Sequence, residues 1–268
     1  MLVRRTDPQT VRLRLTIAFD GTPYAGWQLQ ASGLAVQAVI EAALARLFPS
    51  APRVHGSSRT DSGVHALGLV AHFDVPAAEF RLTPARLLLA INAHLPEDVR
   101  VMQVRRAPPT FHARFGAVGK EYRYLVWNAP AMNPLLRQQA WHVPRVLDLG
   151  AMRRAARTFV GTLDFRAFTA NRGVPLADAV RTVTRCEVRR RGPLLTFVIA
   201  GTGFLYKMCR AIVGTLVQLG QGKLDADDLR RIFDSRDRRT AGMTAPAHGL
   251  VLWKVNYRNP SGPSRHPE

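Results

Sequence analysis

Residue types that could do chemistry are concentrated in one short segment, Gly56 to Ala66. It holds an arginine, an aspartate and a histidine among serine, threonine and glycine, between a predicted helix and a predicted strand. Glycine-punctuated loops of this kind often carry functional side chains. The carboxylate of Asp61 could act as a nucleophile or a general base, but it could also simply form an Asx-turn in which Thr60 and Ser62 cap the backbone.

Two further candidates, Tyr122 and Arg210, lie on predicted regular elements. As a single aromatic in a strand, Tyr122 would usually belong to the core. Arg210 could occupy an ordinary solvated position on a helix, although its neighbours Met208 and Ile212 are apolar, and an arginine beside a buried stripe favours a functional role.

We predict no metal site, because neither His65 nor His112 has a cysteine or a carboxylate at ligand spacing. Cys186 and Cys209 are far apart in the sequence and belong to no C-x-x-C motif, so two reduced thiols are expected. The glycines of the 201–206 segment lack the third glycine of a dinucleotide-binding loop, which argues against NAD.

Charge is the clearest signal of composition. The 268 residues include 38 Lys and Arg against 19 Asp and Glu, a formal net charge of +19. Such an excess favours a polyanionic partner, and the lack of a basic amphipathic helix favours nucleic acid over a membrane surface. No apolar run approaches the ~20 residues that span a bilayer, and residues 1–10 have no apolar core typical of a signal peptide, so we expect a cytoplasmic protein without a membrane partner.

The hydrophobic pattern predicts two α+β halves of similar order. We divide the chain into a flexible N-terminus (1–10), an N-terminal half (11–107), a C-terminal half (108–258) and a disordered tail (259–268), with a proline-rich connection at 105–119. Strands are expected at 12–19, 69–75, 99–104, 121–127, 181–189, 194–200 and 250–255. Helices are expected at 36–47, 84–95, 149–160, 205–219 and 227–233.

Seven motifs, in order along the chain, resemble those of the tRNA pseudouridine synthases of the A family. The R-T-D-x-G-V-H-A signature of that family matches Arg59 to Ala66 and places its nucleophilic aspartate at Asp61. One departure is Ser58, where the family usually has glycine. Serine is compatible with this position only if the backbone avoids positive φ. The other motifs are D-G-T-P-Y-A-G-W-Q (20–28), I-N-A-H-L-P (91–96), F-H-A-R (111–114), Y-R-Y (122–124), F-L-Y-K-M-C-R (204–210) and T-A-P-A-H-G-L (244–250).

The resemblance implies a pseudouridine synthase fold, in which two ferredoxin-like halves form one continuous mixed, mainly antiparallel sheet with helices and a central active-site cleft. It also implies an isomerase without cofactors, a homodimer that modifies uridines of the tRNA anticodon arm around positions 38 to 40. Asp61 would be catalytic, Arg210 would stabilise its charge, and Tyr122 would lie against the uracil. Candidate RNA contacts are Arg59, Tyr24, His65, Arg114 and Lys120.

Several alternatives remain open at this point. Asp61 could add to the sugar at C1′ or remove the C2′ proton, and the residues do not decide between these routes. A non-catalytic RNA-binding protein would keep the charge but would not require Asp61, Tyr122 and Arg210 together. A nucleoside hydrolase would be expected to have a second catalytic carboxylate, and none is identifiable near Asp61.

Overall fold

The computed structural model describes residues 9–170 and 178–258. Within these ranges, ten strands form a single sheet with the path β4-β1-β3-β10-β5-β9-β8-β7, while β2 pairs with β3 and β6 pairs with β5. The β10–β3 and β5–β6 pairs are parallel and the others are antiparallel. The predicted α+β architecture with one continuous, mainly antiparallel sheet is therefore confirmed.

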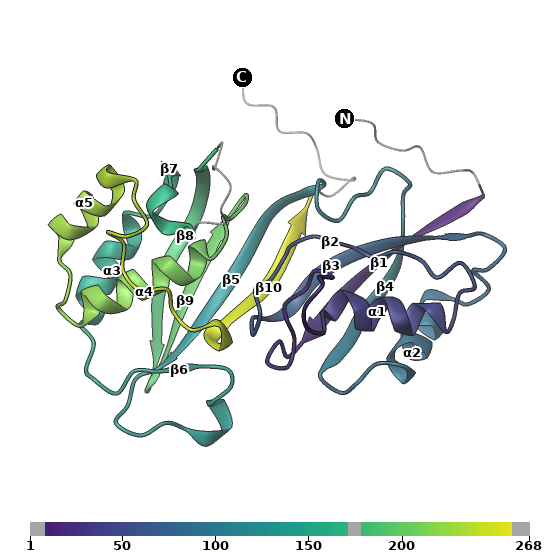
Figure 1. Ribbon diagram of the computed structural model, residues 1–268, viewed down its shortest axis with the longest axis horizontal. Helices are drawn as coiled ribbons and strands as arrows, with labels where there is room; N and C mark the ends of the chain where they lie inside the picture. The colour runs from purple at the N-terminus through teal and green to yellow at the C-terminus, as the bar shows by residue number, and fades with distance from the viewer. Residues whose placement is uncertain (1–8, 171–177, 259–268) are drawn as a thin grey trace.

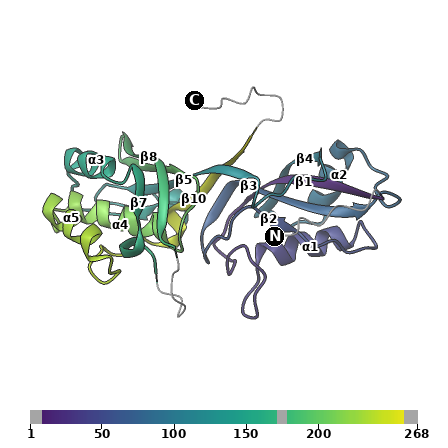
Figure 2. The same cartoon turned by 90° about the horizontal axis from the view of Figure 1, so that it is seen from above.

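The two halves lie side by side along this sheet (Figure 1). Viewed from above, they make an elongated molecule with α1 and α2 at one end and α3, α4 and α5 at the other (Figure 2). The N-terminal half contains β1 (Thr10–Phe19), α1 (Val36–Ala45), β2 (His55–Gly56), β3 (His65–Pro76), α2 (Pro84–Ala93) and β4 (Val99–Ala107). The C-terminal half contains β5 (Ala117–Trp127), β6 (Trp141–His142), α3 (Leu149–Arg157), β7 (Gly161–Asp164), β8 (Val180–Arg191), β9 (Leu194–Gly201), α4 (Met208–Gly220), α5 (Ala226–Ser235) and β10 (Leu250–Tyr257).

Local sequence signals explain several of these elements. In β1, Leu13, Leu15 and Ile17 are fully buried while the residues between them are partly exposed, as expected of a strand with one face on the core. The predicted start of α2 is confirmed, because the Thr83 hydroxyl accepts a hydrogen bond from the Arg86 amide and Pro84 occupies the first turn. Tertiary packing stabilises α4, because most of the side chains of this helix are buried.

The halves join where β10 pairs with the beginning of β3. Only Val251 with His65 and Leu252 with Ala66 form this parallel ladder. The strands approach so closely that a Cβ on Gly68 would lie 2.5 Å from the Trp253 carbonyl oxygen. The loop before β3, which carries the R-T-D signature, therefore lies directly at the junction.

Some boundaries differ from those predicted. β3 begins at residue 65 rather than 69, and α4 begins at Met208 rather than 205 because Lys207 has a left-handed conformation with φ of 59°. The short strands β2, β6 and β7 were not predicted, and α3 ends before the expected residue 160. The tail 259–268 and residues 1–8 of the predicted N-terminal segment lie outside the described residues, and β1 begins at Thr10.

Candidate active site

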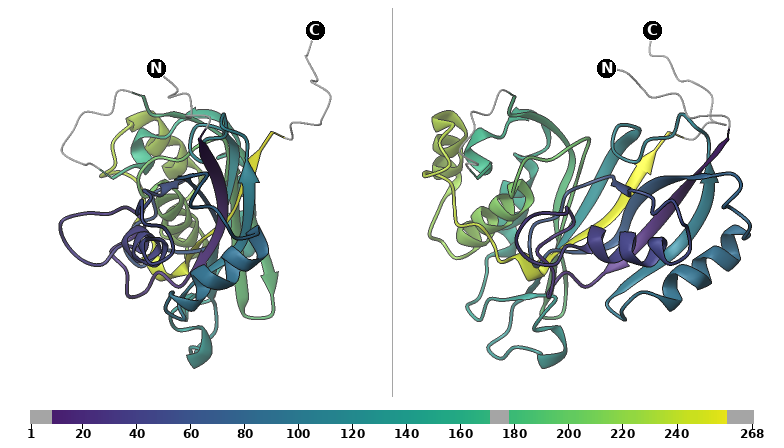
Figure 3. Two further views of the ribbon diagram at one scale, coloured as in Figure 1. Left: turned by 90° about the vertical axis from the view of Figure 1, so that its right-hand side faces the viewer. Right: turned by 45° about the vertical axis from the view of Figure 1, so that its right-hand side comes forward.

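A cleft of about 1420 Å³ lies between the two halves. In the right-hand view of Figure 3, loops of the N-terminal half come up to α4 of the C-terminal half. Asp61 and Tyr122 both line this cleft, one from each half. Its longest continuous lining segments are 56–61 of the N-terminal half and 204–209 and 236–239 of the C-terminal half.

The loop that carries Asp61 is supported from behind by the 20–28 motif. Gly26 has a φ of 92°, and a Cβ there would lie 2.4 Å from the Thr60 carbonyl oxygen, so glycine is needed for both conformation and space. The Trp27 amide donates to that same Thr60 oxygen (3.3 Å), and the Gly63 amide donates to the Tyr24 carbonyl (3.3 Å). This motif therefore fixes the position of the Asp61 backbone.

Asp61 and Arg210 form an ion pair across the junction. Arg210 Nη1 lies 2.9 Å from Asp61 Oδ2, and the side chains are only 13% and 18% exposed, respectively. Arg210 Nε donates to the Ala245 carbonyl (2.8 Å), and the Ala245 amide donates back to the Arg210 carbonyl (3.0 Å). The 244–250 segment thus orients the guanidinium, which in turn compensates and orients the carboxylate.

Tyr122 lies on β5 at the floor of the same cleft. Its ring makes an edge-to-face contact with Phe204, with centroids 5.2 Å apart. Burial raises the pKa of Tyr122, and the nearby Cys209 and Asp61 raise it further, while the Ser58 side chain acts in the opposite direction. The phenol is therefore protonated at neutral pH.

Ser58 has no positive φ, so serine is compatible with the loop conformation at this position. Its hydroxyl lies near Tyr122, but neither this hydroxyl nor that of Thr60 has a hydrogen-bond partner among the described residues, although both are buried. The adjacent Ser57 differs, because its hydroxyl accepts a hydrogen bond from the Val70 amide (3.2 Å). Buried hydroxyls without a hydrogen-bond partner are uncommon, and they indicate either local strain or a position where a ligand or a water molecule binds.

Among the candidate RNA contacts, Arg59, Arg114 and Lys120 line the cleft. Burial and the neighbouring Arg114 lower the pKa of Lys120 to about 8, and its Nζ donates to the Ser57 carbonyl (2.9 Å). Lys120 therefore also fastens β5 to the loop that bears Asp61.

Tyr24 and His65 lie outside the cleft lining. The Tyr24 hydroxyl donates to Asp98 (2.7 Å), while the His65 ring accepts from the Gly21 amide (3.0 Å) and its other nitrogen lies 2.9 Å from the His248 carbonyl. Both side chains are buried. Their role as RNA contacts stays a prediction, and these contacts favour a structural role.

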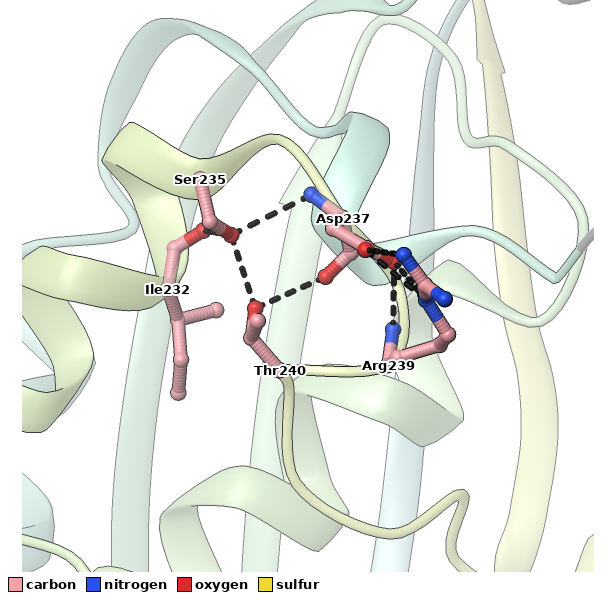
Figure 4. Close-up of polar contacts among 5 residues, drawn as sticks. All are labelled: Ile232, Ser235, Asp237, Arg239 and Thr240. Carbon is pink, nitrogen blue, oxygen red and sulfur yellow. Dashed lines mark hydrogen bonds and ion pairs between the residues drawn. The ribbon is translucent and has the colours of Figure 1, made fainter.

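The opposite wall of the cleft is basic, and its residues belong to none of the sequence motifs. It contains Arg166 and the 236–239 segment, which has three arginines. Here the Asp237 carboxylate holds the Arg239 guanidinium (2.6 and 2.9 Å), and the loop is closed by Ser235 and Thr240, whose hydroxyl oxygens are 2.7 Å apart (Figure 4). The clustering of arginines in the sequence was the available signal, but only the fold brings them opposite Asp61.

Comparison with known proteins agrees with this geometry. Residues 15–116 and 155–258 match a family model described as tRNA pseudouridine synthase. A protein of Methylacidiphilum infernorum named tRNA pseudouridine synthase A is 43% identical over 247 residues, which cover 92% of this chain and 96% of that protein. Proteins of the same name from Geobacillus kaustophilus and Acetivibrio thermocellus are both 44% identical, covering 93% and 91% of this chain and 96% and 99% of their own lengths. The sheet architecture accordingly corresponds to the pseudouridine synthase fold, and this chain belongs to the tRNA pseudouridine synthase family of isomerases.

Proposed function

We propose that this chain isomerises uridine to pseudouridine in the anticodon arm of tRNA, around positions 38 to 40, with Asp61 as the nucleophile. The observation that carries the proposal is the Asp61–Arg210 ion pair, 2.9 Å long and largely shielded, in a cleft that also holds Tyr122. A carboxylate that is ionised, oriented and partly shielded from water is what this chemistry requires.

The reaction exchanges one bond of the uracil for another. The N1–C1′ bond breaks, the ring turns within the cleft, and C5 forms a new bond to C1′. C5 then loses its proton to the surroundings, and N1 gains one. Because the product contains the same atoms as the substrate and no electrons are transferred overall, neither an oxidant nor a group donor is needed.

Asp61 would add to C1′ as the base departs and leave when C5 attacks. In the other route, Asp61 removes the C2′ proton as the base departs, a glycal forms, and the proton returns to C2′ when C5 attacks C1′. Both routes begin from the ionised carboxylate that Arg210 stabilises. In either case the detached uracil must remain in the cleft. The Tyr122 and Phe204 rings, which make an edge-to-face contact, would provide an aromatic surface that holds the detached uracil.

The phenol of Tyr122 would act in its protonated form. Because burial raises its pKa above the usual value, a free phenolate is not available at neutral pH. Tyr122 can therefore stack on the uracil and donate a hydrogen bond to it, and any transfer of the C5 proton through this hydroxyl would require concerted loss of the phenol proton.

Arg59, Arg114 and Lys120 would contact RNA phosphates on the Asp61 side, with the arginines of 236–239 on the other wall. We further propose a cytoplasmic homodimer in which one subunit binds the tRNA body and the other presents Asp61. Among the described residues, no helix combines the length and hydropathy needed to cross a membrane.

The direct test is conversion of tRNA transcripts labelled with tritium at uridine C5, because formation of the new C5–C1′ bond releases this tritium. Transcripts with uridine at only one of positions 38, 39 and 40 identify the target, and nucleoside analysis identifies the product. Asp61→Asn should bind tRNA without turnover, since it keeps the shape of the side chain and removes its charge. Activity above a few per cent of wild type would exclude Asp61 as nucleophile or base. Binding without conversion by the wild-type protein would identify a non-catalytic RNA-binding protein.

A further inference from the structure

Phe115 is the one exposed aromatic side chain among the Phe, Tyr and Trp residues that the structure describes. It is 61% exposed, whereas other phenylalanines of the described chain are buried or half-buried. Full burial of such a ring would contribute about 1.5–3 kcal/mol, so its exposure leaves apolar area available for a ligand.

The backbone around Phe115 is fixed. The amides of Arg114 and Phe115 both donate to Nδ1 of His112 (3.1 and 3.2 Å), and the Ala113 carbonyl accepts from the Tyr257 hydroxyl (2.6 Å). Upstream, the Arg12 guanidinium donates to two carbonyls of the same segment, those of Pro109 and Phe111 (both 2.6 Å). Phe115 is thus held outwards by the connection between the halves.

The inner side of the Phe115 ring lies against His112, which belongs to a group of three neighbouring histidines. Its centroid is 4.4 Å from that of His112, which in turn lies 4.7 Å from His72, and His55 lies 5.1 Å from His72. Burial and neighbouring positive groups lower the pKa of His112, and its Nδ1 accepts two amide hydrogen bonds, so the ring is neutral at pH 7. Phe115, His112, His72 and His55 therefore form a continuous cluster of aromatic rings, and the described histidines are not arranged to hold a metal ion.

This cluster lies at the edge of the cleft. Arg114, which lines the cleft, has its guanidinium 5.5 Å from the Phe115 ring centroid. On the other side, His55 directly precedes Gly56 and Ser57, which also line the cleft. An exposed aromatic face beside a cation fits an unpaired nucleobase with its phosphate, because every base has a stacking face and the phosphate is anionic. The neighbouring positive charge makes a purely apolar partner a poorer fit.

We propose that Phe115 is a stacking platform for an unpaired base of the tRNA near the reacting uridine, with Arg114 contacting the backbone phosphate of the same stretch. This inference rests on the proposed action on tRNA. It assigns the connection between the halves a role in substrate binding, separate from the chemistry at Asp61.

The test compares the affinities of Phe115→Ala, Phe115→Trp and wild type for an anticodon-arm stem–loop and for a fully paired RNA duplex of equal length. Phe115→Ala should bind the stem–loop about 5- to 150-fold more weakly and the duplex with unchanged affinity, while Phe115→Trp, which keeps a stacking face, should bind like wild type. Leu135→Ala is the matched control, because Leu135 is 84% exposed and does not line the cleft.

Two further measurements complete the experiment: the salt dependence of the RNA affinity and the oligomeric state of the variants. Arg114→Ala should reduce the slope of log affinity against log salt by about 1, whereas Phe115→Ala should leave the slope unchanged. Unaltered stem–loop affinity of Phe115→Ala, or an equal loss for the duplex, would refute stacking. Dissociation of a wild-type dimer by Phe115→Ala, with RNA affinity per protomer retained, would identify a subunit contact instead. Tritium release by the wild-type protein is measured in parallel, so failure of the proposed reaction is distinguished from failure of the platform.

Discussion

The Asp61–Arg210 pair predicts that stability and catalysis are coupled at this site. Arg210→Ala removes the guanidinium 2.9 Å from the carboxylate and leaves Asp61, only 18% exposed, without its cation. Breaking a buried pair costs about 3–5 kcal/mol, and the residual exposure of Asp61 places the expected loss near the lower end, at about 3 kcal/mol. For a chain of this length, that loss lowers the melting temperature by about 5 °C.

Adding Asp61→Asn should then restore part of the stability, because the stranded charge is gone. The restoration should be incomplete, because Arg210 also donates to the Ala245 carbonyl. This hydrogen bond is lost in Arg210→Ala and in the double variant alike. We expect a coupling of about 2 kcal/mol in a double-mutant cycle measured by urea unfolding. Both Asp61→Asn and the double variant should lack turnover.

A matched control for this cycle is the exposed pair of Arg230 and Asp227, whose nitrogen and oxygen are 3.1 Å apart and whose side chains are 75% and 69% exposed. Its coupling should stay below about 0.5 kcal/mol, since water and salt screen exposed pairs. If Asp61→Asn and Arg210→Ala prove additive like this control, the two residues do not interact in the free enzyme. Arg210 would then be an RNA contact, and the assigned role would be wrong.

Three further predictions concern the cleft and the histidine cluster. Tyr122→Phe should bind tRNA normally but lose about 100-fold or more in single-turnover conversion, because only the hydroxyl is removed; unchanged turnover would make Tyr122 a packing residue. The affinity for tRNA should fall steeply between about 50 and 200 mM salt because phosphate contacts release counterions, and a flat response would contradict a role for the +19 charge. Burial lowers the pKa of His72 from 6.5 to about 3. As the pH falls below about 6.5, this residue therefore takes up a proton in the unfolded chain before it does so in the folded protein, and the free energy of unfolding should decrease. At pH 5, the decrease due to His72 should be about 2 kcal/mol. Urea unfolding of His72→Gln, which keeps an acceptor for the Ala113 amide, should show a shallower pH dependence, and an identical one would contradict this assignment.

Local patterns were sufficient to predict elements that local physics determines. Alternation in β1 and the Thr83-Pro84 start of α2 are examples, because one depends on a half-buried strand and the other on a cap next to proline. The two-residue strands β2 and β6 carry no such pattern. They exist only because a neighbouring strand supplies hydrogen-bond partners.

The candidate site shows the same division. The motif around Asp61 could be recognised from adjacent residues, but its contact with Arg210 joins positions 149 apart in the chain and depends on the packing of both halves. The left-handed conformation of Lys207, which shifts the beginning of α4, is equally invisible, since lysine has no preference for positive φ. The family resemblance identified Arg210 as a candidate, and only the folded structure shows its ion pair with Asp61.

The position of the ion pair explains why the catalytic centre would depend on the whole sheet. Asp61 comes from the N-terminal half and Arg210 from the C-terminal half, and the sheet connects them through the two-residue β3–β10 ladder directly after the Asp61 loop. Because the attraction between two charges falls as the distance between them grows, the relative placement of the halves determines how strongly Arg210 stabilises the Asp61 carboxylate. A Cβ on Gly68 would lie only 2.5 Å from the Trp253 carbonyl oxygen, so a larger side chain at this position would displace the two strands whose pairing brings Asp61 within 2.9 Å of Arg210.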